Sequence, residues 1–314
     1  MSMHLIVGAG PIGTATASLL ADRGERVRLV TRRGTGPDRP DIEKVAADAS
    51  DPAALTELAE GATALYNCTG APYDRWLTDL PPLATACLAA ARACGAVLAT
   101  TGNLYGYGPA DGPLTERSPL RATGPKGRLR ARLWQEALAA HEAGDVRVTE
   151  VRGSDYLGAG TQSLLTSLVL PKLLAGARVS VPADLNAPHS WTYAGDVART
   201  LVAAAADERA WGRPWHVPTA APVSMAELAA RAAVLAGVAA PRLSTMPTAV
   251  LWLGGLGNPI VRELRETQYQ FRRPFVLDSS AATDAFGIEP RPIEDSLRET
   301  VAWLADNDAA HAKR

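Results

Sequence analysis

The sequence contains too little cysteine for a disulfide framework. Its 314 residues include three cysteines, Cys68, Cys87 and Cys94, and no two of them form a Cys-x-x-Cys pair. Proteins that depend on disulfides usually carry an even number of regularly spaced cysteines. The shortage therefore predicts reduced thiols and a cytoplasmic location, and we expect no metal site.

An excess of either charge is also absent. The chain has 32 Lys and Arg against 33 Asp and Glu, a formal net charge of −1, which argues against nucleic acid or an anionic membrane as the main partner. The apolar stretch at 249–256 is far too short to span a bilayer, and the N-terminus lacks the basic segment of a signal peptide. We expect a small-molecule carbonyl substrate and a monomer or homodimer.

Lysine is the scarce cation, because only four of the 32 basic residues are lysines. Such usage is typical of a GC-rich genome, in which arginine replaces lysine wherever either cation serves. Lys126 runs against this bias, so we expect it to have a specific role.

Short β-rich runs alternate with Ala- and Leu-rich helical runs through the first half of the chain, the pattern of a parallel doubly wound sheet. Strands are predicted at 4–7, 26–31, 43–46, 64–68, 96–100 and 147–152, and helices at 12–23, 52–59, 81–94 and 125–143. Beyond these, the sequence predicts a helical stretch at 163–174, a return to the sheet at 189–206 and a C-terminal helix at 292–304. Because 314 residues exceed the usual size of one core, a second lobe is expected. We predict a Rossmann-like α/β domain formed by 1–155 and 187–213, and a smaller substrate lobe formed by 156–186 and 214–314.

A glycine-rich turn follows the first predicted strand. The run Gly8-Ala9-Gly10-Pro11-Ile12-Gly13 has the spacing in which glycines permit a tight turn, a close approach of pyrophosphate and close helix packing. The helix that it opens would offer free N–H groups to the phosphates. The run predicts a dinucleotide site, with a plain glycine turn as the alternative.

The end of the second strand indicates which dinucleotide. NAD sites place Asp or Glu there to bind the ribose hydroxyls, whereas this strand ends in Thr31-Arg32-Arg33. Guanidinium groups suit a 2′-phosphate, so NADP(H) is the expected cofactor. The alternative is that both arginines are solvated surface residues.

A second motif lies between residues 98 and 136. Leu98-Ala99-Thr100-Thr101-Gly102-Asn103-Leu104-Tyr105-Gly106 precedes Thr123-Gly124-Pro125-Lys126-Gly127-Arg128-Leu129-Arg130. This arrangement resembles the extended short-chain dehydrogenase/reductase superfamily, in its epimerase/dehydratase-like branch. In that family a Ser or Thr precedes a Tyr-Gly pair, and a Tyr-x-x-x-Lys motif opens the next helix. Thr101 matches the Ser/Thr, but Lys126 occupies the Tyr position and Arg130 the Lys position.

The resemblance implies a nicotinamide cofactor and places its contacts along the chain. Asp48 matches the residue that contacts adenine, although it could instead begin a helix, and Ser154 follows the sixth strand near the expected nicotinamide. The expected cofactor-binding residues are Gly8, Gly10, Pro11, Ile12, Gly13, Thr31, Arg32, Arg33, Asp48, Cys68, Thr69, Gly70, Lys126 and Ser154.

The expected catalytic residues are Thr101, Lys126 and Arg130. Carbonyl reduction needs a hydride and a donor aimed at the developing alkoxide, and the Thr101 hydroxyl can donate. Lys126 could replace the missing Tyr as proton donor or act as a fixed charge, because the helix dipole, Arg130 and burial should favour proton release. Arg130 could hold ribose hydroxyls or polarise the carbonyl. Alternatively, both belong to a solvated basic helix face, or the substrate's own hydroxyls supply the proton.

Family members that act on nucleotide sugars usually carry Arg-Asp-Phe-x-Tyr-Val-x-Asp, whose Arg binds phosphate. Here the matching run is His189-Ser190-Trp191-Thr192-Tyr193-Ala194-Gly195-Asp196, so His189 replaces that Arg and a nucleotide-sugar substrate is disfavoured. The expected substrate-binding residues are Asn103, Tyr105, Tyr156, His189 and Trp191.

Taken with the missing Tyr, these features resemble biosynthetic ketoreductases with degenerate motifs. The sequence predicts an NADPH-dependent ketoreductase acting on a small, polycyclic or polyketide-type metabolite. Two other classes stay open: a sugar-nucleotide epimerase or dehydratase with altered residues, and a non-catalytic NADP-binding sensor.

Overall fold

Seven parallel strands form the central sheet of the computed structural model, which describes residues 2–257 and 259–312. Their spatial order is β3-β2-β1-β4-β5-β6-β11. They are β1 (Met3–Val7), β2 (Arg26–Thr31), β3 (Ile42–Ala46), β4 (Ala62–Asn67), β5 (Val97–Asn103), β6 (Arg147–Gly153) and β11 (Arg213–His216). The Rossmann-like doubly wound sheet that the sequence predicts is thereby confirmed.

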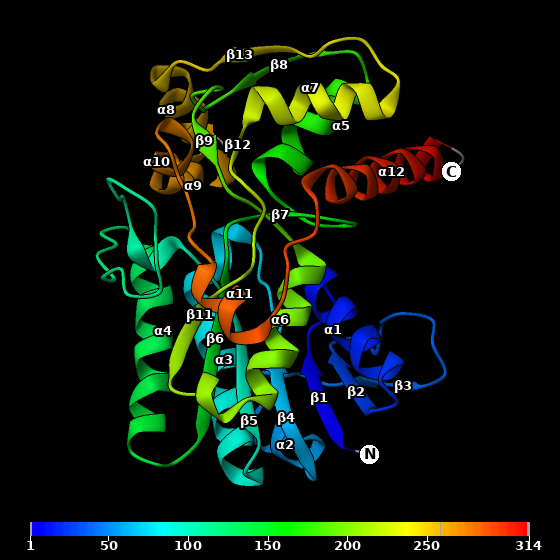
Figure 1. Ribbon diagram of the computed structural model, residues 1–314, viewed down its shortest axis with the longest axis vertical. Coiled ribbons are helices and arrows are strands. Elements are labelled where there is room, and N and C mark those ends of the chain that lie inside the picture. Colours follow the sequence, from blue (N-terminus) through cyan, green and yellow to red (C-terminus); the bar gives the residue numbers. More distant parts are fainter. Residues whose placement is uncertain (1, 258, 313–314) are drawn as a thin grey trace.

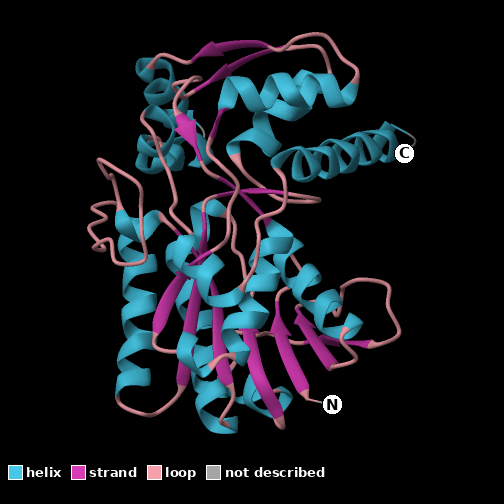
Figure 2. Cartoon of the chain, viewed as in Figure 1, coloured by secondary structure: helices cyan, strands magenta, loops and turns pink. Residues whose placement is uncertain are grey.

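Helices cover both faces of this sheet (Figures 1 and 2). The helices are α1 (Pro11–Asp22) and α6 (Ala194–Ala206) on one face, and α2 (Pro52–Leu58), α3 (Trp76–Cys94) and α4 (Pro125–Glu142) on the other. The inner strands are therefore buried on both sides, which explains their continuous apolar runs. The carboxyl ends of the strands all point to the same edge, where the lobe begins.

Proline marks the start of several helices. Pro11 and Pro125 occupy the first turns of α1 and α4, where a missing N–H costs no hydrogen bond. Helix α3 differs from the predicted 81–94, because it begins at Trp76 and contains Pro81 and Pro82. Both prolines lie in the second turn of the helix, where each removes one backbone hydrogen bond, and the helix continues through them to Cys94.

The predicted return of 189–193 to the sheet is wrong. Strand β9 (Pro188–His189) pairs with β12 (Val223–Ser224), and β10 (Trp191–Tyr193) pairs with β7 (Asp155–Leu157), each as a separate two-stranded ladder. The chain returns through α6 and β11 instead. The predicted boundary between residues 213 and 214 falls inside β11.

The lobe lies above the carboxyl edge of the sheet (Figure 1). Its remaining elements are α5 (Leu170–Leu174), β8 (Arg178–Val181), α7 (Met225–Ala236), β13 (Arg242–Thr245), α8 (Thr248–Gly257), α9 (Pro259–Thr267), α10 (Tyr269–Arg272) and α12 (Ile293–Ala312). The predicted helix at 163–174 is a π-helical turn followed by α5. Helix α11 (Ser280–Phe286) leaves the lobe and packs against α6 and β11, where Ala282 joins the core of the sheet domain.

Candidate active site

The turn between β1 and α1 has the geometry that a pyrophosphate requires. Gly8 has a φ of 99°, and a Cβ at Gly13 would lie 1.9 Å from the Gly8 carbonyl oxygen. A Cβ at Gly10 would meet nothing within 4 Å, and no side chain caps the start of α1 at Gly10, Pro11 and Ile12. The first N–H groups of α1 thus have no side-chain cap, which fits a phosphate-binding helix N-terminus.

The end of β2 presents two exposed arginines without hydrogen-bonded partners in the described part of the chain. Arg32 and Arg33 are exposed and make no hydrogen bond or ion pair with any residue in 2–257 or 259–312. Thr31 closes the turn, because its Oγ1 accepts from the Thr35 N–H at 2.8 Å. No carboxylate stands at the position that would bind ribose hydroxyls in an NAD site.

Asp48 lies close to these arginines. Its Oδ1 accepts from the Ser50 hydroxyl at 2.7 Å, and the pKa of Asp48 is lowered by the hydrogen bonds from Ser50 and by the charge of Arg32. Asp51, not Asp48, caps α2 by accepting from two backbone N–H groups. The helix-start alternative for Asp48 is therefore wrong.

The residues after β4 form the wall next to the glycine turn. The Cys68 N–H donates to the Val7 carbonyl at 3.0 Å, and burial raises the pKa of the Cys68 thiol to about 11. Thr69 donates its hydroxyl to Asn67 Oδ1 at 2.6 Å, and Gly70 is exposed. This segment is held firmly against β1, and its thiol is a buried, inert group.

The carboxyl ends of β5 and β6 carry Thr101 and Ser154, and Arg130 of α4 lies beside Thr101. We call these three residues the reaction edge. Arg130 Nη1 lies 3.5 Å from the Thr101 carbonyl oxygen. Three buried atoms, Thr101 Oγ1, Arg130 Nε and Ser154 Oγ, have no oxygen or nitrogen partner within the described part of the chain, although the Thr101 hydroxyl is near enough to the Cys68 thiol to oppose the rise in its pKa. Buried polar atoms are almost always paired, so these three are suited to a ligand.

Burial also perturbs the charge of Arg130. It lowers the pKa of the guanidinium, while the charge of Glu150 opposes this effect. A cavity of about 90 Å³ adjoins the same side chain and is lined in part by Asn67, Thr101 and Glu150. The reaction edge therefore combines the Arg130 guanidinium, whose Nε has no partner among the described residues, with an adjoining cavity.

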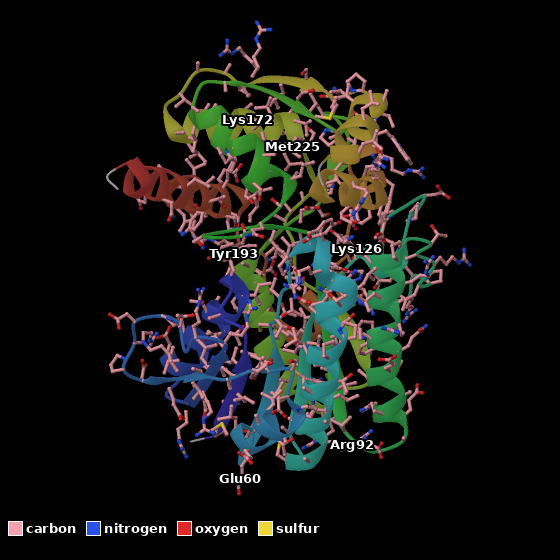
Figure 3. All side chains as sticks on the ribbon, turned by 180° about the vertical axis from the view of Figure 1, so that it is seen from behind. Glu60, Arg92, Lys126, Lys172, Tyr193 and Met225 are labelled. Atoms are coloured by element: carbon pink, nitrogen blue, oxygen red, sulfur yellow. The ribbon has the colours of Figure 1, made fainter. Side chains whose placement is uncertain are left out.

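Lys126 lies where α4 meets the lobe (Figure 3). It is 1% exposed, and its ammonium pairs with Glu263 and, at 4.0 Å, with Glu266 Oε2. Glu266 Oε1 also accepts from the N–H groups of Lys126 and Gly127, at 2.8 and 3.1 Å. We call Lys126, Glu263 and Glu266 the latch, because they join α9 to the start of α4.

The latch changes the expected part played by Lys126. The proposed release of its proton assumed an ammonium without carboxylate partners, whereas two carboxylates neutralise it. The alternative of a solvated basic face is also wrong for Lys126 and Arg130, which are shielded from solvent, although Arg128 and Arg132 are exposed.

Two aromatic residues at this edge were missed by the sequence reasoning. Lys126 Nζ lies 4.7 Å from the centroid of the Tyr73 ring, and Arg130 Cζ lies 4.7 Å from that of Trp76. Trp76 in turn stacks on Tyr105 at 5.6 Å. Such cation–π contacts stabilise buried cations. The available signal was position, since Tyr73 and Trp76 follow β4 at the edge where ligands collect in open α/β sheets.

The expected substrate-binding residues divide into two groups. Asn103 Oδ1 accepts from the Tyr105 N–H at 3.1 Å, and Trp191 Nε1 donates to the Val223 carbonyl at 2.8 Å within the lobe core. These two support local structure. Tyr156 donates its hydroxyl to the Gly102 carbonyl at 3.0 Å, His189 Nε2 lies 2.8 Å from Asp155 Oδ2, and Tyr105 stacks on Trp76.

No described helix is long and apolar enough to cross a membrane. Among the described residues, no group of three or more His, Cys, Asp or Glu side chains could hold a metal ion.

Comparison with known proteins matches the first two thirds of the chain to one family. The model of the NAD dependent epimerase/dehydratase family matches residues 4–217. No curated protein sequence matches the chain.

Solved structures share the fold over the whole chain at low sequence identity. The dTDP-glucose 4,6-dehydratase of Bacillus anthracis, in complex with NAD, is 17% identical, with a TM-score of 0.79 and coverage of 98% of each chain. The UDP-glucose-4-epimerase of Stenotrophomonas maltophila, with bound NAD and formylated UDP-arabinopyranose, is 20% identical, with a TM-score of 0.79 and coverage of 99% of this chain and 100% of that one. The Bordetella bronchiseptica enzyme WbmH, in complex with NAD+, is 19% identical, with a TM-score of 0.76 and coverage of 98% and 99%.

Proposed function

This chain belongs to the NAD dependent epimerase/dehydratase family, and we propose that it is an NADP(H)-dependent reductase of a carbonyl group on a small metabolite. The observation that carries the proposal is the pair of unpartnered donors, Thr101 Oγ1 and Arg130 Nε, at the carboxyl edge of the sheet. Both donors belong to a site that lacks the family's tyrosine.

The chemistry of these two side chains suits a developing oxyanion. A bound reduced nicotinamide supplies the hydride. Thr101 donates its hydroxyl proton in a hydrogen bond to the carbonyl oxygen, and the Arg130 guanidinium stabilises the negative charge that forms there. Arg130 cannot release a proton, so the proton that completes the alcohol passes through the Thr101 hydroxyl from solvent or from a hydroxyl of the substrate.

Lys126 has a positioning part in this proposal. Its ammonium is taken by Glu263 and Glu266, and its backbone N–H donates to Glu266. These contacts fix the first turn of α4, from which Arg130 projects one turn later on the same face. The latch therefore sets the position of Arg130 relative to Thr101.

The preference for NADP(H) rests on Arg32 and Arg33. Both are exposed and form no hydrogen bond or ion pair among the described residues, although the charge of Arg32 acts on Asp48. They would bind the 2′-phosphate as a pair of guanidinium groups. The glycine turn and the N-terminus of α1 would hold the pyrophosphate.

Family membership favours a second candidate, a sugar-nucleotide epimerase or dehydratase. The structural neighbours include an epimerase with a bound UDP-sugar derivative. Against this candidate, Lys126 stands at the position of the tyrosine that would deprotonate a sugar hydroxyl, and its ammonium is already paired.

The test is to follow the NADPH absorbance band with a panel of polycyclic ketones, quinones and UDP-sugars. We expect NADPH oxidation with aromatic ketones, with the hydride delivered to one face. Interconversion of a UDP-sugar without net use of cofactor would instead establish the second candidate. NADPH binding without turnover of any panel member would favour the sensor.

A further inference from the structure

Asp155 and His189 form a buried polar pair, the second junction between the sheet domain and the lobe. Asp155 begins β7 and His189 ends β9, and His189 Nε2 lies 2.8 Å from Asp155 Oδ2. The two side chains are 13% and 4% exposed. The pair belongs to neither the reaction edge nor the latch.

Hydrogen-bond partners occupy both ring nitrogens of His189. Its Nδ1 lies 3.2 Å from the Gln270 carbonyl oxygen, and its Nε2 lies 2.8 Å from Asp155 Oδ2. Both nitrogens are therefore engaged by oxygen atoms of the protein.

Aromatic side chains close off the His189 ring. Its centroid lies 4.9 Å from that of Phe271, with the planes 12° apart, and 4.6 Å from that of Trp191. Phe275 stacks at 5.7 Å. Because its nitrogens and its faces contact protein groups, His189 cannot also bind a phosphate.

The ammonium of Lys126 is also engaged. It pairs with Glu263 and Glu266, so the two junctions together hold three carboxylates, those of Asp155, Glu263 and Glu266. A nucleoside diphosphate needs unpaired cations or free N–H groups for its phosphates. At these two junctions it would meet carboxylates instead.

Neutral phenols lie close to both junctions. Burial raises the pKa of Tyr73 to about 12, and the charges of Glu266 and Asp155 raise it as well. Burial likewise raises the pKa of Tyr105 and of Tyr269. The surroundings of Asp155 are thus largely aromatic, and Arg130 is a nearby charge, since both groups act on the pKa of Tyr156.

A buried polar atom without a partner adjoins the Asp155–His189 pair. Asp155 bonds to His189 through Oδ2, and its side chain is 13% exposed, so the carboxylate is open to a further donor. Ser154, the preceding residue, is 7% exposed, and its Oγ is buried without a partner among the described residues. Such an atom requires an explanation, and a ligand with hydroxyl and carbonyl groups would satisfy it.

We propose that Asp155 is a substrate-binding residue that accepts a hydrogen bond from a hydroxyl group of an uncharged aromatic ketone, and that this site excludes nucleoside diphosphates. The inference rests on the proposed function, because the same ligand would carry the carbonyl that is reduced at Thr101 and Arg130. It names the substrate class that the reaction edge alone leaves open.

The experiment measures binding by calorimetry with NADP+ saturating, so that no turnover is needed. The probes are 6-hydroxy-1-tetralone, its methyl ether 6-methoxy-1-tetralone, UDP and UDP-glucose. We expect the hydroxy compound to bind at least about tenfold more tightly than the ether, since a site built to accept a hydroxyl proton discriminates against its loss. UDP and UDP-glucose should give no heat of binding.

Variants locate the effect. Asp155→Ala should reduce the discrimination between hydroxy compound and ether to less than about threefold, whereas Asp74→Ala, an exposed carboxylate beside Tyr73, should leave it unchanged. If Asp155→Ala does not fold, the affinities of the unmodified protein for the four probes decide whether the proposed substrate site exists.

Three results would overturn the inference: equal affinity for the hydroxy compound and the ether, no binding of either, or saturable binding of UDP or UDP-glucose. NADPH oxidation is measured separately. Discriminating binding without oxidation would therefore refute the reductase and leave the substrate site standing.

Discussion

The glycine turn and the latch both offer groups that bind charge, but these groups come from different parts of the chain. In the glycine turn, the N–H groups suited to a phosphate come from residues close together in the chain, Gly10, Ile12 and Gly13. In the latch, Lys126 meets Glu263 across 137 residues of chain. One site is encoded by local backbone geometry, and the other exists only once the lobe has folded against α4.

This difference predicts how each site responds to substitution. Backbone sites fail when a side chain is added, because there is no space for it. Side-chain sites fail when a charge is removed, because its partner is left unpaired. Four experiments test that contrast, in order of decreasing effect.

Gly13→Ala should abolish cofactor binding. The added Cβ would lie 1.9 Å from the Gly8 carbonyl oxygen, so the turn and the start of α1 must separate. The matched variant Gly10→Ala has open space around its Cβ and should keep its thermal unfolding midpoint while weakening NADPH binding. Circular dichroism and calorimetric titration measure both, and normal NADPH binding by Gly13→Ala would contradict the assignment of the turn.

Arg130→Met should lower kcat on the order of 10²–10³-fold, the usual cost of losing a donor to an oxyanion. Methionine keeps the length of the side chain and removes its charge. Arg128→Met, two residues earlier on the exposed face of α4, is the control and should retain normal kcat. The comparison needs a substrate found in the NADPH assay, and equal kcat in both variants would remove Arg130 from the reaction.

Replacing Arg32 and Arg33 together with alanine should weaken NADPH binding by about 1–3 kcal/mol, the scale of hydrogen bonds to charged groups. NADH affinity should stay the same, since NADH lacks the 2′-phosphate. Arg26→Ala, an exposed residue at the opposite end of β2, controls for the loss of positive charge. Equal affinities for NADH and NADPH in the unmodified protein would contradict the NADP(H) preference.

Lys126→Met should lower the free energy of unfolding by about 1–2 kcal/mol. Removing one partner of a fully buried pair costs more, but Glu263 is 23% exposed and Glu266 14% exposed. Urea denaturation measures the change, with the exposed Lys172→Met as control. Adding Glu263→Gln to Lys126→Met should recover part of the loss, and strictly additive losses would argue against the latch.

The fold and the glycine turn were predictable because their signals are local. Alternating apolar runs and the position of Gly8, Gly10 and Gly13 lie within short windows of sequence. Thr101 and Arg130 followed from a family motif. Their aromatic neighbours did not, because the contacts of Tyr73 and Trp76 depend on how α3 and α4 pack side by side.

The missed elements have physical reasons as well. Strand β11 contains Pro214, which argues against a strand except at the edge of a sheet, and β11 is an edge strand. Glu263 and Glu266 carry no sign in the sequence that they will reach α4. Asp155 directly follows the expected site residue Ser154, but its pairing with His189 depends on two short ladders that periodicity cannot detect.

The return of α11 to the sheet domain has a consequence for the synthesis of the chain. The sheet is not complete until β11 (Arg213–His216) pairs with β6, and its outer face is not covered until α11 (Ser280–Phe286) packs on α6 and β11. A ribosome-bound chain ending at residue 212 would therefore expose the open edge of β6. The nucleotide domain therefore completes its folding only after α11 has been synthesised. A fragment that ends at residue 155, the first domain boundary, should aggregate when it is expressed alone.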